Sequence, residues 1–228
     1  MSKPQDPRAK PLNRENILKV ALKLADSKGI ESLSMRKLAE KLHVKAMSLY
    51  NHVKDKDDVL SGIVDIVVGK ISLPEDNIEW KTAMRQRAIS AHEILLGHPW
   101  ASSVLMSQSN VGPEALGYID KTLGFFRRAG FSIEMADHGW NLLDSYIYGY
   151  TLQELNYPFD MKKVKLVAKD YLPFLKEYPY LLELTQYIVD SSYKKNFQGV
   201  HDFSFGLEII LDGLEKNLIS GKFERKGK

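Results

Sequence analysis

Apolar residues recur along most of the chain at intervals of three and four, the spacing that places them on one face of an α-helix. The first such segment carries Ile17, Val20, Ala21 and Leu24 and ends at Gly29. Strand signals are scarce, because no Asn-Gly or Asp-Gly pair separates two runs of alternating apolar residues. The pattern therefore predicts an all-α protein.

The same spacing predicts the order of the elements. Two short helices are expected at 34–42 and 46–53, separated by three residues, and a connector helix begins near Asp57. Further helices are predicted at 80–96, 113–129, 132–156, 179–193 and 202–219. A break at Ser72-Leu73-Pro74 suggests the division into parts. These are disordered basic tails at 1–12 and 222–228, an N-terminal domain with the start of the connector at 13–72, and a larger helical bundle at 73–221.

Composition excludes several classes of protein. The 228 residues are 44% hydrophobic and 27% charged, as in ordinary globular proteins. Cysteine is absent, which excludes disulfides, thiolate metal sites and a cysteine nucleophile. The longest stretch without a charge, 94–113, contains two glycines and two prolines, which a lipid-facing helix does not tolerate. The N-terminus lacks the apolar core of a signal peptide, so we expect a cytoplasmic protein without membrane contact.

The net charge of +3 is unevenly distributed. Residues 1–60 hold 13 Lys and Arg against 8 Asp and Glu, whereas the rest of the chain holds 19 against 21. A basic end on a slightly acidic remainder favours a nucleic-acid-binding module joined to a second domain.

Signatures of catalysis are missing from the sequence. The motifs G-x-S-x-G, G-x-G-x-x-G and H-E-x-x-H do not occur. The six histidines never stand three or four residues apart, so no local helical metal pair exists. We therefore expect a protein that is not an enzyme and that uses no metal or other cofactor.

The most informative segment is 33–53, a short helix, a three-residue turn and another short helix, the spacing of a helix-turn-helix. Leu38, Ala39 and Leu42 are expected to pack the first helix onto the segment at 13–28. The start of the second helix is then left exposed, where small, polar and basic side chains can enter a major groove. From the residues alone, a plain helical hairpin remains the alternative. The outward-facing positions are Lys45, Ala46, Met47, Ser48, Tyr50, Asn51 and His52, followed by Lys54 and Lys56.

Residues 13 to about 71 resemble the DNA-binding domain of the TetR family of repressors. The resemblance is strongest at 29–39 and at 49–56, where a Tyr-x-His sequence leads into Lys-x-Lys before an apolar helix. Segments 95–98, 129–132 and 205–218 resemble the tetracycline repressor subgroup, so the likeness covers nearly the whole chain.

This resemblance implies a repressor that binds a palindromic double-stranded DNA operator as a homodimer and is released by a small-molecule effector. It assigns phosphate contacts to Tyr50, His52 and Lys56, and places Lys45, Ala46, Met47 and Asn51 near the bases. Arg36, Ser48 and Lys54 complete the implied DNA contacts. The family usually has glycine at position 43, so His43 is expected to adopt a left-handed conformation that is uncommon for histidine.

The second domain is expected to bind the effector, through aromatic residues and a few polar anchors. For each residue, burial in the core is the alternative. The candidates are His98, Trp100, Leu105, Gln108, Phe126, Trp140, Asn141, Tyr146, Tyr150 and Gln153. Leu105 stands where the tetracycline repressors carry a metal-binding histidine, and leucine cannot bind a metal. We therefore do not expect a tetracycline–magnesium chelate bound through histidine.

The segments at about 133–156 and 202–219 are expected to form the dimer surface, because they carry more apolar residues than one core needs. Gly206 and Gly213 would allow close helix approach. Burial within one subunit is the alternative. The candidates are Phe203, Phe205, Leu207, Ile210 and Leu214.

Overall fold

The computed structural model describes residues 12–107, 112–156, 172–191 and 202–220. The described residues are helical and contain no strand, which confirms the predicted all-α class. Residues 1–11 of the predicted N-terminal tail, the C-terminal tail at 222–228 and Gln108 lie outside the described residues.

The N-terminal part consists of α1 (Arg14–Lys28), a 3-10 turn η1 (Ile30–Ser32), α2 (Met35–Leu42), α3 (Ala46–Leu49) and α4 (Lys56–Val68). Side chains cap the helices where the sequence offers them. Asn13 accepts a hydrogen bond from the amide of Asn16, Ser34 from that of Lys37, and Asp55 from that of Asp58. Each cap satisfies an amide that has no partner inside its helix.

Helix α3 is shorter than predicted, since it ends at Leu49 rather than at Val53. The amide of Val53 still bonds to the carbonyl of Leu49, but its side chain turns into the core. The next amide, Lys54 N–H, donates to the carboxylate of Asp58 at 2.9 Å. The regular helix therefore ends early, because the Val53 side chain packs in the core and the Lys54 amide bonds to the Asp58 carboxylate instead of to a helix carbonyl.

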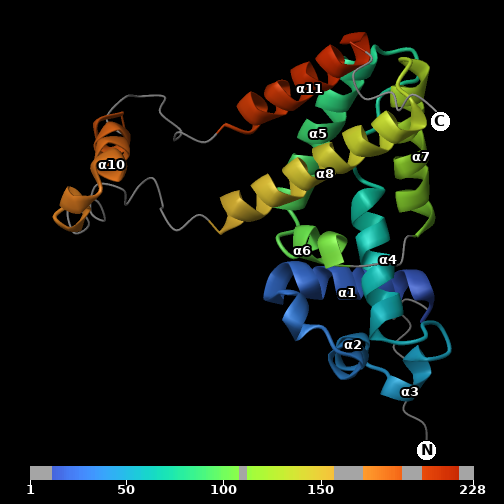
Figure 1. The fold of residues 1–228 in the computed structure, drawn as a ribbon. Helices are drawn as coiled ribbons and strands as arrows, with labels where there is room; N and C mark the ends of the chain where they lie inside the picture. The colour runs from blue at the N-terminus through green and yellow to red at the C-terminus, as the bar shows by residue number, and fades with distance from the viewer. Residues whose placement is uncertain (1–11, 108–111, 157–171, 192–201, 221–228) are drawn as a thin grey trace, which may run out of the picture.

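The larger part contains α5 (Trp80–Leu96), α6 (Ala101–Ser107), α7 (Pro113–Arg128), α8 (Ile133–Leu155), the 3-10 turn η2 (Phe174–Glu177), α10 (Pro179–Ser191) and α11 (Phe203–Ser220). Helices α8 and α11 run side by side across α5, and α4 joins this body to α1–α3 (Figure 1). Helix α6 was missed by the sequence pattern. It forms because Ala101, Ser102 and Val104 are buried in contact with neighbouring helices, chiefly α8.

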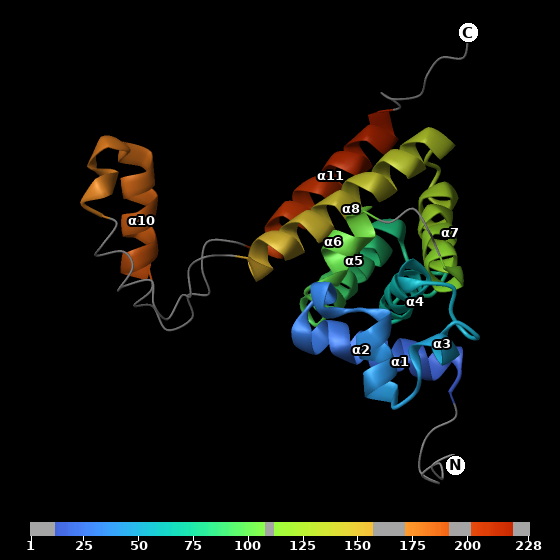
Figure 2. The same cartoon turned by 90° about the horizontal axis from the view of Figure 1, so that it is seen from below.

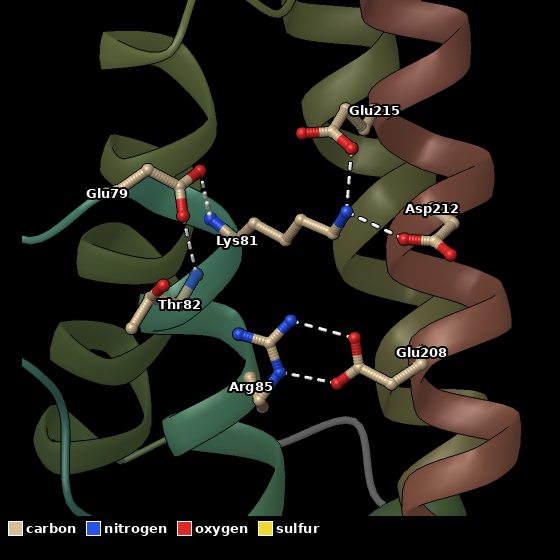
Figure 3. Close-up of polar contacts among 7 residues, drawn as sticks. All are labelled: Glu79, Lys81, Thr82, Arg85, Glu208, Asp212 and Glu215. Atoms are coloured by element: carbon tan, nitrogen blue, oxygen red, sulfur yellow. Dashed lines mark hydrogen bonds and ion pairs between the residues drawn. The ribbon is translucent and has the colours of Figure 1, made fainter.

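Ion pairs hold α11 on α5 in one rotational setting (Figure 3). Lys81 Nζ lies 2.7 Å from Asp212 Oδ1 and 2.6 Å from Glu215 Oε2. Arg85 pairs with both carboxylate oxygens of Glu208, with 2.8 Å between Nη2 and Oε2. These contacts, with the buried leucines of α11, decide which side of α11 faces outward.

Helix α10 stands apart from the helical body in both views (Figures 1 and 2). It packs with η2, and together these two elements expose several large apolar side chains. They are Phe174, Tyr178, Tyr180, Leu181, Leu184 and Tyr187.

Candidate functional site

The helix-turn-helix predicted from the sequence is formed by α2 and α3. Leu38, Ala39 and Leu49 are buried, and Leu42 and Val44 pack against this core. His43 adopts the expected left-handed conformation, with φ 57° and ψ 37°. Its amide bonds back to the carbonyls of Ala39 and Glu40, which closes the turn.

The outer surface of these helices carries the residues that the sequence placed there. Met47 is 75% exposed and Tyr50 is 47% exposed, although large side chains with much apolar surface are more often buried. The other exposed positions are Arg36, Lys45, Asn51, Lys54 and Lys56, and the half-exposed ones are Ala46, Ser48 and His52. The structure therefore gathers all ten predicted residues on one end of the molecule (Figure 1).

A salt bridge holds the segment that carries Lys54 and Lys56. Arg14 donates to both carboxylate oxygens of Asp58, at 2.8 and 2.7 Å. The guanidinium lowers the pKa of Asp58 below its usual range. Since the Lys54 amide also donates to Asp58, this carboxylate ties the start of α1 to the turn before α4.

A second polar group joins the N-terminal domain to the larger domain. Asp26 of α1 accepts a hydrogen bond from Trp100 Nε1 at 2.8 Å, and its same oxygen lies 2.7 Å from His98 Nδ1. On the other side of the ring, His98 Nε2 lies 3.0 Å from Lys70 Nζ. His98 and Trp100, which the sequence placed among effector contacts, are therefore domain-junction residues here.

The larger domain buries a complete ion pair in its core. The guanidinium of Arg87, on α5, donates to Asp144 of α8 and has no exposed surface. Asp144 also accepts from Trp140 Nε1 at 2.8 Å and from the Tyr148 hydroxyl at 3.1 Å. Neither charge was predicted from the sequence. The signal was available, because Arg87 falls on the apolar stripe of its predicted helix.

Three donors beside this ion pair have no hydrogen-bond partner of acceptable geometry among the described residues. They are Arg87 Nε, Arg87 Nη1 and the hydroxyl of Tyr118 on α7. The Arg87 guanidinium lies over the Tyr118 ring, 4.5 Å from its centroid. Each buried group without a partner costs about 1–3 kcal/mol of stability, so this arrangement is unfavourable as it stands.

The other predicted effector contacts lie in different surroundings. Tyr146 and Tyr150 pack with His92 and Phe203, where burial raises the pKa of Tyr150 to about 12 and lowers that of His92. Phe126 is fully buried against Trp80 and Phe131, as the core alternative proposed. Asn141 and Gln153 are exposed, and Leu105 is half-buried.

The structure leaves only some of the residues predicted for the dimer surface exposed. Phe203, Leu207 and Leu214 are buried within the chain, where α11 packs on α5 and α8, so the alternative of burial in one subunit accounts for them. Gly206 serves the same packing, since a Cβ there would meet the Tyr146 hydroxyl. Ile210 is half-buried. Phe205 and Ile209, in contrast, are 70% and 57% exposed.

Two further observations concern ligands and membranes. Within the described ranges, no group of three or more histidine, aspartate or glutamate side chains could hold a metal ion. No helix in that part of the chain is long and apolar enough to cross a membrane.

Comparison with known families matches both parts of the chain. Residues 17–63 match the family described as bacterial regulatory proteins, tetR family. Residues 73–218 match the tetracyclin repressor-like C-terminal domain.

Individual relatives agree with this match. An HTH-type transcriptional regulator of Saccharopolyspora erythraea is 38% identical over 126 residues, and the alignment spans 54% of this chain and about half (53%) of that relative. The tetracycline repressor protein class D of Escherichia coli is 28% identical over 212 residues, which cover 91% of each chain. The crystal structure of apo ActR from Streptomyces coelicolor aligns with a TM-score of 0.76 and 25% identity, over 93% of this chain and 99% of that one.

Proposed function

The chain belongs to the TetR family of bacterial regulatory proteins, and on this premise we propose that it is a cytoplasmic transcriptional repressor that binds a palindromic operator as a homodimer and is released by a small-molecule effector. The main support for this proposal is the exposed surface that α2 and α3 form at one end of the molecule. There α3 and the turn that follows it present Met47, Tyr50 and Asn51 next to Lys54 and Lys56. Such a surface suits base edges in the major groove, with phosphates on either side.

The proposed contacts divide by chemistry. Lys45, Ala46, Met47 and Asn51 would lie against base edges, where they set the operator sequence. Tyr50, His52 and Lys56 would hold phosphates, with Arg36, Ser48 and Lys54 beside them.

The proposed effector is a small organic molecule rather than a tetracycline–magnesium chelate bound through histidine. Leu105, at the position of the metal-binding histidine in the related repressors, supports this distinction. Isothermal titration with tetracycline and magnesium tests it, and submicromolar binding would contradict it.

Selection of sites from random DNA tests the repressor proposal. A homodimer that reads two major grooves is expected to select a palindrome with half-sites about one helical turn or more apart, with an affinity that falls steeply with salt. Tyr50→Ala should weaken binding to all sequences alike, whereas Asn51→Ala should change the preferred bases. Selection without a palindrome would contradict the proposal, and identical profiles for the two variants would contradict the division of roles.

We also propose that Asp26 couples the two domains. Asp26→Leu removes the acceptor of Trp100 and the partner of His98 and leaves both buried, so it should lower the free energy of unfolding by about 1–3 kcal/mol. It should also weaken operator binding, because the DNA-binding helices lose a contact that orients them. Urea denaturation and operator titration measure the two effects. Asp26→Asn, which keeps an acceptor oxygen, is the matched control, and unchanged operator affinity in Asp26→Leu would contradict the coupling role.

A further inference from the structure

The buried charges between α5, α7 and α8 are expensive for a domain of this size. Arg87 is fully buried, in a helix whose other inward positions are almost all apolar. A buried ion pair is often no more stable than a well-packed apolar pair of the same volume. The unpartnered nitrogens of Arg87 make this one less favourable still. A role in recognition would explain why such a group occurs at this place.

The groups left without partners are donors, while the acceptor is satisfied. Asp144 accepts from Arg87 through Oδ1 and from Trp140 and Tyr148 through Oδ2, so both of its oxygens have donors. The N–H groups on Nε and Nη1 of Arg87 have no partner among the described residues, and the guanidinium keeps its positive charge because it does not lose its proton in proteins. Burial raises the pKa of the Tyr118 hydroxyl, so it remains protonated and can donate. The chemistry that complements this arrangement is an oxygen acceptor with negative charge.

The surroundings are aromatic. The ring of Tyr118 lies against the guanidinium, and the indole of Trp140 and the phenol of Tyr148 reach Asp144. Flat rings favour a flat apolar ligand body through stacking. Few convergent polar groups in aromatic surroundings are the usual composition of a small-molecule site.

The position also suits communication with the DNA-binding domain. Helices α5, α6 and α7 all pack on α8, and Ser102 of α6 carries a further buried hydroxyl that has no partner in the part of the chain that the structure describes. Ser102 stands two residues after Trp100, whose indole bonds to Asp26 of α1. A ligand that moves α8 or α6 would therefore act next to the domain junction.

We propose that Arg87 and Tyr118 form the polar anchor of the effector site, and that the effector is an aromatic acid whose carboxylate or ionised phenol accepts hydrogen bonds from them. This inference rests on the proposed function, because it names the ligand class of the effector domain. Asp144 acts as a positioning residue that holds the guanidinium in place.

The test uses the full-length protein and two matched pairs of probes. Anthraquinone-2-carboxylate is compared with its methyl ester, and 1,2-dihydroxyanthraquinone with its dimethyl ether, by isothermal titration. At least one acid should bind, and more tightly than its uncharged partner. The pair that shows this difference distinguishes a carboxylate from an ionised phenol.

Two variants locate the binding. Arg87→Met combined with Asp144→Leu removes both charges and leaves none unpaired, and circular dichroism with thermal melting checks its fold. Acid binding should weaken about ten- to a hundredfold in this double variant, and to a smaller extent in Tyr118→Phe, which removes one donor. If neither acid binds, if the uncharged partners bind equally well, or if the double variant binds as the wild type does, the proposal is wrong.

Operator titration separates this inference from the proposed function. An acid that binds through Arg87 and also weakens operator binding supports both. Binding through Arg87 that leaves the operator affinity unchanged supports the anchor and contradicts the release mechanism.

Discussion

Arg87→Met alone is expected to lower the free energy of unfolding by about 3–5 kcal/mol, because it leaves the Asp144 carboxylate buried without its counter-charge. Trp140 and Tyr148 would still donate to Asp144, but neither carries a charge. A loss of this size is a large part of the stability of a typical domain, so the variant should be partly unfolded at ordinary temperatures. Urea denaturation of the full chain measures it.

The double variant Arg87→Met with Asp144→Leu is the control for this prediction. It should recover most of the loss, since two apolar side chains replace the pair and no buried charge remains. A single variant within about 1 kcal/mol of the wild type would mean that Asp144 is neutralised or rehydrated at little cost, against the prediction. The same result would weaken the interpretation that the pair is kept for recognition rather than for stability.

Phe205→Asp combined with Ile209→Asp is expected to convert the proposed homodimer into a monomer. Both side chains are exposed one turn apart on the outer side of α11, whereas Leu207, Leu211 and Leu214 pack its other side into the core. Gly213 lies on the same helix, and a Cβ added there would meet none of the described residues, which leaves room for a second backbone. A buried carboxylate without a partner in such an interface is strongly unfavourable.

Loss of the dimer should reduce affinity for the selected palindrome by about a hundredfold or more, because the two half-sites no longer bind as one unit. Sedimentation velocity measures the mass, and fluorescence anisotropy of labelled operator measures the binding. Leu116→Asp on α7 is the matched control, since Leu116 is as exposed as Ile209 but lies on another helix. A double variant that remains dimeric would rule out this face of α11 as the interface.

Much of the N-terminal domain could be predicted from local patterns. The spacing of apolar residues placed α2 and the start of α3 correctly, and the same pattern identified Leu38 and Ala39 as core. The left-handed conformation of His43 followed from the resemblance to the TetR family, which usually has glycine at this position. These features depend on residues that are close together in the sequence, so the spacing of apolar residues and the residue types in turns can predict them.

Local sequence patterns did not predict contacts between residues that are far apart in the sequence. Arg87 and Asp144 are 57 residues apart, and Asp26 and His98 are 72 apart. His98 and Trp100 were predicted as effector contacts because of their type, and nothing in the sequence indicated their contacts with Asp26 of α1. Helix α6 escaped prediction because its seven residues are held by packing on α8 rather than by a strong pattern of their own.

The sequence by itself determined the all-α class, the helix-turn-helix and the residues that its outer surface presents, because helical periodicity and capping act over a few residues. The tertiary structure alone decided which side of α11 faces outward and which polar groups are buried together. Both depend on the rotation of one helix against another, which is set by side chains from distant segments. Phe203 and Phe205 illustrate the difference: two residues apart on one helix, the first packs in the core and the second remains exposed.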